Sequence, residues 1–194
     1  MVLYFGCNGG GNSTISNNSI NDACNTQNNK NKNDRIEAKL LSLGLKLPQP
    51  LKVPPNIKTP SAWVRIHKDK AYISGHGPQN PDGSISGPFG KVGTSDVSVE
   101  QAYESAKLAG LSILGSLKRE VGSLDEVTAW LQVRVMINTL EGFTKTADVA
   151  DGFSDLIVSL YGPNVGAHAR SAIGVQALPV NLPVIIDALV EISD

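Results

Sequence analysis

The sequence has few cysteines, no long apolar run and no excess of positive charge. Its two cysteines, Cys7 and Cys24, lie in the first 34 residues, so the rest of the chain has no thiol for a disulfide framework or a nucleophile. No stretch approaches the roughly 18 apolar residues that a membrane span requires. Lys and Arg number 17 against 18 Asp and Glu, a net charge of −1. This balance argues against nucleic acid as the main partner, and we expect a soluble protein with no membrane partner.

The N-terminal part divides into a leader and an arm. Residues 8–34 hold ten asparagines and only two isoleucines, which is too little apolar surface to offset the entropy of ordering, so residues 1–34 are predicted to be disordered. The first five residues are too short for a signal-peptide core, and we expect a cytoplasmic protein. An organelle transit peptide is the weaker alternative, and a bridge between the two cysteines stays open. Residues 35–61 predict a short helix and a Pro-rich arm.

Hydrophobic patterning over residues 62–194 predicts an α+β domain. Alternating apolar residues indicate five strands, and apolar residues at helical spacing indicate two helices. The strands are expected at 63–67, 70–74, 127–138, 169–177 and 184–192. One helix is expected to begin at a capping box with Ser98 as N-cap and Gln101 reaching back, and to end at Gly122, and the other runs from about 146 to 161, before Gly162-Pro163. The order ββαβαββ gives two β-α-β crossovers on one small mixed sheet, with both helices on one face. Because the other face also carries Val, Ile and Leu, we expect oligomerisation to cover it.

The third strand has a clear apolar face. The alternation predicts that Leu131, Val133, Val135 and Ile137 point together into the core.

Familiar catalytic and cofactor motifs are missing. The chain has no Gly-x-Ser-x-Gly elbow, no P-loop, no His-Glu-x-x-His and no complete dinucleotide-binding glycine motif, so none of these catalytic or nucleotide-binding sites is expected. The three histidines, His67, His76 and His168, lie far apart without ligand spacing. We therefore interpret them as ordinary surface or hydrogen-bonded histidines and expect no metal.

Three carboxylates share one face of the second predicted helix. Asp148, Asp151 and Asp155 follow one another at i, i+3 and i+7. A cation site or an acid–base pair is one interpretation. We favour the other, a solvated helix face with acids in its first turns.

Arg170 is the residue that most needs a partner. It enters a strand of small and apolar residues, where an arginine cannot lose its charge and requires an anion. The guanidinium fork fits a carboxylate bidentately. That carboxylate belongs either to a ligand or to the protein, for example to Asp187 on the neighbouring strand, and the sequence leaves both open.

Two segments resemble a known family. Ala169-Arg170-Ser171, followed by Leu178-Pro179 and the run Val184–Leu189, is similar to the closing signature of the YjgF/RidA family, and Tyr72–Pro78 resembles its early strand and loop. The similarity covers roughly residues 36–193. The extra first helix, the run Gly152–Leu156 and His168 make the chain most similar to a longer, poorly characterised branch.

The resemblance implies a chorismate-mutase-like fold and a homotrimer with clefts between subunits. Its best understood members deaminate reactive 2-imino acids to 2-keto acids and ammonia without a cofactor. The arginine matching Arg170 holds the substrate carboxylate, and Ser74 matches a serine that lines the cleft. The resemblance thus implies a small carboxylate or imino acid as the partner.

The chain departs from these deaminating members at three places. Ile185 stands where they carry a glutamate thought to orient water, Ala172 replaces a cysteine, and Ala147 stands where an asparagine lines the cleft. Isoleucine cannot orient water or transfer a proton. Asp187 points to the same sheet face one step along the strand, about 7 Å away, and is a candidate substitute.

Three functions remain in competition. The first is an imine deaminase-like hydrolase with Arg170 as anchor and Ser74 and Asp187 assisting, beside Ala172 and Ile185. The second is a non-catalytic trimer that binds a carboxylate metabolite, which Ile185 and Ala172 favour. The third, RNA cleavage, follows from the family's name "L-PSP endoribonuclease", and the charge balance and the lack of an aromatic stacking platform argue against it.

Overall fold

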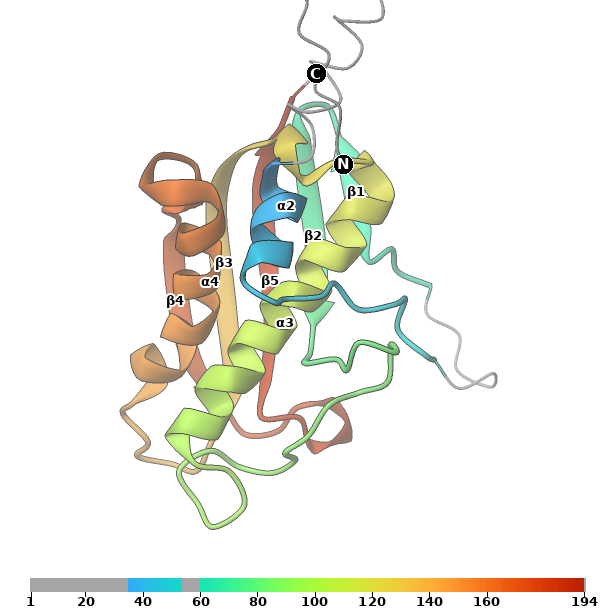
Figure 1. Cartoon of the computed structure of the whole chain (residues 1–194). Helices are drawn as coiled ribbons and strands as arrows, with labels where there is room; N and C mark the ends of the chain where they lie inside the picture. The colour runs from blue at the N-terminus through green and yellow to red at the C-terminus, as the bar shows by residue number, and fades with distance from the viewer. Residues whose placement is uncertain (1–34, 54–59, 194) are drawn as a thin grey trace, which may run out of the picture. The chain divides into compact units, whose positions relative to one another are not determined.

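The computed structural model describes residues 35–53 and 60–193 and shows one sheet with helices on one of its faces (Figure 1). The elements are α2 (Arg35–Ser42), β1 (Val64–His67), β2 (Lys70–His76), α3 (Val99–Val121), the 3₁₀ turn η1 (Leu124–Glu126), β3 (Val127–Asn138), α4 (Thr146–Gly166), β4 (Ala169–Val175), the 3₁₀ turn η2 (Pro179–Asn181) and β5 (Val184–Ile192). The predicted α+β class is confirmed. The predicted leader, with both cysteines, lies outside the described residues.

The sheet has the strand order β1-β2-β5-β3-β4. β3 and β4 are parallel, whereas the other neighbouring pairs are antiparallel. β1 and β2 form a hairpin closed at Lys68 and Asp69, and Lys68 has a positive φ of 54°. β4 is therefore an edge strand, and its outer side has no strand partner among the described residues.

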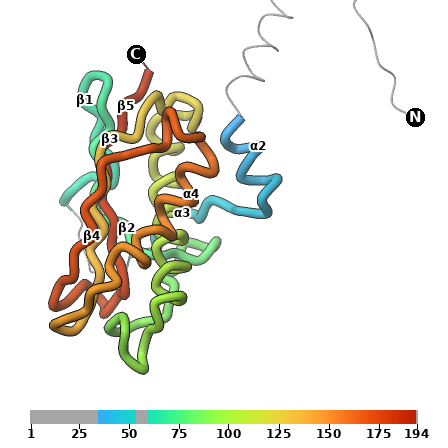
Figure 2. The backbone as a smooth tube through the Cα atoms, turned by 90° about the vertical axis from the view of Figure 1, so that its left-hand side faces the viewer, coloured from blue at the N-terminus to red at the C-terminus, as the bar shows by residue number. Residues whose placement is uncertain are grey.

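The helices α3 and α4 lie side by side on one face of the sheet, as predicted (Figure 2). The capping box of α3 is formed, because the Ser98 side chain accepts from the Gln101 amide and the Gln101 side chain accepts from the Ser98 amide. α4 is interrupted at Gly162, whose φ of 75° is not helical, and one more turn follows. No helix in the described residues is long and apolar enough to cross a bilayer.

The helix α2 belongs to the same core as the sheet. Its apolar residues Ile36 and Leu40 are buried, and Arg35 pairs with Asp125 of η1 at 3.1 Å. The Ile36 amide donates to the same carboxylate. The arm that the sequence set apart as residues 35–61 thus packs, over its described part, against the domain that follows it.

The apolar face of β3 differs from the prediction at its beginning. Val133, Val135 and Ile137 are buried as expected, but Leu131 is only half-buried and Trp130 enters the core instead. The pairing of β3 with β5 shifts register between Trp130 and Gln132. A bulge of this kind re-aims the side chains before it, which simple alternation does not anticipate.

The face of the sheet opposite the helices carries apolar and charged residues together. Tyr72 and Ile173 are 50% and 43% exposed. Met136, Ile185 and Leu189 are half-buried on the strands between them. No described helix covers this face (Figure 2). A large exposed apolar face is typical of a surface that meets another protein chain.

Candidate functional site

Arg170 lies on β4 and points toward α4, on which both of its side-chain partners lie. α4 covers this edge of the sheet (Figure 1). It pairs with Val133 of β3, whose side chain is buried on the helix side. Its Nη1 donates to Asp151 Oδ1 at 2.7 Å and to Ser154 Oγ at 2.9 Å, both on α4. The Arg170 side chain is 23% exposed and that of Asp151 50% exposed. The arginine thus has an internal anion that still borders solvent.

Ser154 links Arg170 to His168. The Ser154 hydroxyl lies 3.0 Å from His168 Nε2, and His168 Nδ1 lies 2.7 Å from the Gly166 carbonyl oxygen. A carbonyl accepts only, so Nδ1 carries the proton, and Nε2 accepts from the Ser154 hydroxyl. Burial, together with the positive charge of Arg170, lowers the pKa of His168. The histidine is therefore neutral near pH 7 and holds the serine oxygen toward Arg170.

One edge of the Arg170 guanidinium remains open. Both hydrogen bonds described above use Nη1. Within residues 35–53 and 60–193, neither Nε nor Nη2 has a protein acceptor. These two nitrogens form the edge that binds a carboxylate bidentately. The contacts to α4 fix the guanidinium and leave that edge available.

The ion pair between Arg170 and Asp187 that the sequence left open does not form. Asp187 accepts from Arg134 Nη2 at 2.8 Å and from Arg134 Nε at 2.9 Å. Asp187 alternates with the buried Ile186 and Ala188 on β5, so it points away from the helices, while Arg170 points toward them. The physical reason is the two-residue period of a strand, which puts these two side chains on opposite faces. Within one chain, Asp187 cannot serve the guanidinium.

The other predicted site residues fall into two groups. Ala172 follows Arg170 on the same side of β4 and packs against the core. Ser74 lies on β2, where its hydroxyl donates to the Ala62 carbonyl at 2.7 Å. Its neighbour Gly75 is in contact with Ile185, since a Cβ at Gly75 would lie 2.8 Å from Ile185 Cγ2. β5 and β3 lie between Ser74 on β2 and Arg170 on β4, which puts these two strands roughly 14 Å apart, whereas Ile185, on β5, has only β3 between its strand and β4.

Three residues near Arg170 were not singled out as its partners. The sequence pattern predicts a solvated helix face for Asp151 and an ordinary histidine for His168, and Ser154 enters only as part of the run Gly152–Leu156. The spacing of Asp151 and Ser154 at i and i+3 puts them on one side of α4, which is a signal in the sequence. Only the packing of α4 on β4 shows that this side meets Arg170. The other two carboxylates of the helix are not part of the group, because Asp155 accepts from Tyr103 Oη at 2.8 Å and Asp148 is exposed.

The described residues contain no group of three or more His, Cys, Asp or Glu side chains placed to hold a metal ion. The interpretation of the helix acids as a cation site therefore finds no support in that part of the chain.

His76 is a buried histidine with a structural function. It is 4% exposed, and its ring nitrogens contact the Ser74 carbonyl oxygen at 2.6 Å and Ser116 Oγ at 2.8 Å. Burial lowers its pKa to about 4, against about 6.5 in an unfolded chain. Below pH 6.5 this histidine binds a proton in the unfolded chain but stays neutral in the folded chain. The free energy of unfolding therefore falls as the pH is lowered from 6.5 toward 4.

We expect the free energy of unfolding to fall by about 2 kcal/mol between pH 7.5 and pH 5 through His76 alone. Urea unfolding at both pH values measures it. A His76→Gln variant keeps a polar side chain that does not titrate, so the difference between the two proteins isolates His76 from His168 and the carboxylates. Equal pH dependence in both proteins would contradict the expectation.

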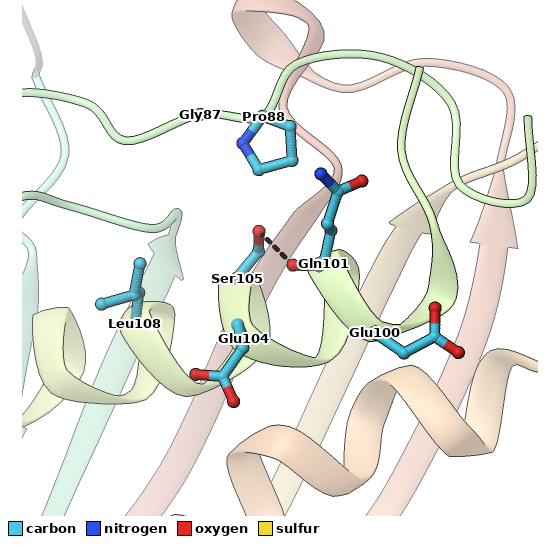
Figure 3. Close-up of a pocket in the computed structure, with 7 residues that line it drawn as sticks. All are labelled: Gly87, Pro88, Glu100, Gln101, Glu104, Ser105 and Leu108. Atoms are coloured by element: carbon cyan, nitrogen blue, oxygen red, sulfur yellow. Dashed lines mark hydrogen bonds between the residues drawn. The ribbon is translucent and has the colours of Figure 1, made fainter. Parts of the chain in front are cut away.

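Two hollows on the surface lie away from these residues. One, of about 310 Å³, is lined by Gly87, Pro88 and the first turns of α3 from Glu100 to Leu108 (Figure 3). The other, of about 560 Å³, lies at the ends of β3 and β4 and includes Lys91. The Lys91 ammonium donates to Asn138 Oδ1 and to the carbonyls of Thr139 and Gln176, so its three donors are used within the chain. Neither hollow contains Arg170.

The chain is similar to proteins from several organisms. Protein TCP17 of Trypanosoma cruzi is 34% identical over 161 residues, which cover 82% of this chain and 96% of that protein. The crystal structure of Atu1372 from Agrobacterium tumefaciens, of unknown function, is 32% identical, covers 84% of this chain and 97% of its own, and has a TM-score of 0.70. A crystal structure from Shewanella oneidensis is 24% identical with a TM-score of 0.71, over 81% of this chain and 99% of its own.

No family model matches the sequence. Protein TCP17 and Atu1372 are nevertheless each more than 30% identical to this chain, and the match covers nearly the whole length of each of them. The resemblance found in the sequence also agrees with the strand order, with the two helices that cover the sheet and with the signature Ala169-Arg170-Ser171. The chain belongs to the YjgF/RidA family.

Proposed function

We propose that this protein binds a small 2-imino acid by its carboxylate at Arg170 and hydrolyses the imine. The observation that carries the proposal is the state of the guanidinium: Nη1 is held by Asp151 and Ser154, and the Nε–Nη2 edge has no acceptor in the described part of the chain. A fixed guanidinium with one open edge is suited to a carboxylate because no ordering cost remains for the arginine. Membership of the YjgF/RidA family supports the substrate class.

The reaction consumes one water. The protonated imino acid R–C(=NH₂⁺)–COO⁻ adds water at the imine carbon, the resulting carbinolamine loses its nitrogen, and the products are R–CO–COO⁻ and NH₄⁺. Arg170 holds the carboxylate, and the barrier falls through positioning and through electrostatics at a preformed site. The hydrolysis needs no electron acceptor and no cofactor.

A non-catalytic binder is the second candidate, and Ile185 with Ala172 favours it. Neither side chain can orient water or transfer a proton. Asp187, the proposed substitute, is engaged by Arg134 on the face of the sheet away from Arg170. In this version the carboxylate ligand binds at Arg170 and leaves unchanged.

A homotrimer would bring the two groups of site residues together. In one chain, Ser74 is three strands away from Arg170, and Ile185 is two strands away. The exposed face of the sheet carries Tyr72 and Ile173, which is suited to burial against other copies. β4 is an edge strand, so its side chains can meet a neighbouring subunit. Light scattering should give three times the mass of one 20.5 kDa chain, and a monomer would refute this arrangement.

Ammonia release from 2-iminopropionate generated in situ tests the proposal. We expect the protein to accelerate release roughly tenfold or more over the uncatalysed rate. In a parallel thermal melt, 2-oxobutyrate should raise the melting temperature of the protein, because a ligand that binds the folded state stabilises it by mass action. Stabilisation without acceleration identifies the binder, and neither effect with any small carboxylate would refute both candidates.

A further inference from the structure

The partner of Arg170 is itself open to solvent. Asp151 uses one oxygen, Oδ1, to accept from Arg170 Nη1 at 2.7 Å. Its Oδ2 accepts no hydrogen bond from the described residues, and half of the Asp151 side chain is exposed. The ion pair thus presents an unused cationic edge on Arg170 beside an unused anionic oxygen on Asp151.

The two charges of the pair cancel, its contacts Ser154 and His168 are neutral, and the nearest further carboxylate on α4 adds a negative charge. Ser154 is neutral, and His168 is neutral near pH 7 because burial and Arg170 disfavour its protonated form, with a lowered pKa. The third carboxylate on this side of α4, Asp155, accepts from Tyr103. A simple anion that approaches Arg170 is therefore attracted by the guanidinium and repelled by Asp151, whose Oδ1 lies 2.7 Å from Arg170 Nη1.

A ligand with a positive and a negative group side by side gains from both residues. Its carboxylate can take the Nε–Nη2 edge of Arg170 while its cationic nitrogen approaches Asp151 Oδ2. The protonated 2-imino acid is such a ligand, because its carboxylate and its nitrogen are attached to the same α-carbon. A 2-keto acid has the carboxylate but no cation.

We propose that Asp151 is a specificity-determining residue that selects zwitterionic 2-iminium or 2-amino acids over 2-keto acids at Arg170. The inference rests on the carboxylate anchor proposed above. Asp151 favours the protonated imine, the form in which the imine carbon is most electrophilic. After hydrolysis the nitrogen leaves as NH₄⁺, and the keto acid that remains is repelled by Asp151, which promotes its release.

A simpler function for Asp151 is to position Arg170 alone. The two functions predict opposite effects of removing Asp151 on the affinity for an anion. If Asp151 only positions the guanidinium, its removal weakens every carboxylate ligand together. If it selects by charge, removal weakens a zwitterion but strengthens an anion, because both an attraction and a repulsion are lost. Asp151→Asn is the suitable change, since the amide keeps an oxygen to accept from Arg170 Nη1.

Calorimetric titration with 2-aminobutyrate and 2-oxobutyrate, which share one carbon skeleton, tests the inference on the full chain. The unmodified protein should bind 2-aminobutyrate more tightly. In Asp151→Asn we expect roughly tenfold weaker 2-aminobutyrate and roughly tenfold tighter 2-oxobutyrate binding. Asp148→Asn, on the same helix but exposed and outside the pair, should leave both affinities unchanged.

The outcomes separate this inference from the proposed anchor. An unchanged ratio of the two affinities in Asp151→Asn, or an equal loss of both ligands, overturns the selection by Asp151, while the anchor stands if Arg170→Ala loses both. If neither ligand binds the unmodified protein, or if both still bind to Arg170→Ala, the anchor itself fails.

Discussion

Replacing Arg170 by alanine is expected to abolish carboxylate binding and any acceleration of ammonia release. The change removes the open Nε–Nη2 edge and leaves Asp151, a negative charge, as the nearest ionised group. Loss of a charge-assisted bidentate contact of this kind costs about 2–4 kcal/mol, roughly 30- to 700-fold in affinity. The thermal shift with 2-oxobutyrate and the ammonia assay both measure it.

Two further variants serve as comparisons for Arg170→Ala. Arg170→Lys keeps the positive charge but lacks the fork, so it should recover only part of the affinity. Arg65→Ala removes an exposed strand arginine at the opposite edge of the sheet and should change neither measurement. Arg170→Ala leaves Asp151 without its cation, but the Asp151 side chain is half exposed, so water can solvate its charge. We therefore expect the melting temperature of the ligand-free variant to stay within a few degrees of that of the unmodified protein. Full binding by a folded Arg170→Ala protein would rule out the anchor.

Replacing Gly152 by alanine is expected to give the largest loss of stability. Gly152 lies where α4 packs on α3, and a Cβ there would lie 2.1 Å from the Tyr103 carbonyl oxygen and 2.8 Å from its carbonyl carbon. These are backbone atoms within α3, so they cannot rotate away. The helices must separate, which also disturbs the burial of Phe153. We expect a loss of about 3–5 kcal/mol, above the usual cost of overpacking, measured by urea unfolding.

Gly115→Ala is the matched control for this change. Gly115 also lies in a helix, but its nearest neighbours would be the Pro48 carbonyl oxygen at 3.3 Å and the flexible end of Arg119 at 3.4 Å. Alanine gains up to about 1 kcal/mol of helix propensity over glycine at such a position. The net effect should therefore be small. An equally small effect at Gly152 would show that α3 and α4 are not packed as closely as described. Because Asp151 and Ser154 flank Gly152 on α4, a destabilised variant should also lose ligand binding.

Most of the fold could be predicted from local patterns. The capping box at Ser98 and Gln101 fixes the start of α3 by a local hydrogen-bond exchange, and the alternation in β5 correctly separates Ile186 from Ile185 and Asp187. Trp130 could not be placed, because a bulge is decided by pairing with a strand more than fifty residues away. β2 extends past the predicted 70–74 to His76, because Gly75 and His76 carry no strand propensity that the pattern could show.

By itself, the sequence determined that Arg170 needs an anion, because a guanidinium in an apolar strand cannot be neutralised and cannot remain without a partner. It also determined which face of β5 carries Asp187. Only the tertiary structure decided which anion Arg170 meets. The packing of α4 on β4 brings Asp151 and Ser154, 19 and 16 residues earlier in the chain, against the guanidinium, while Asp187 goes to the other face. A contact between a helix and a strand depends on the position and the orientation of the helix on the sheet. Neither the local periodicity nor the spacing of residues specifies these.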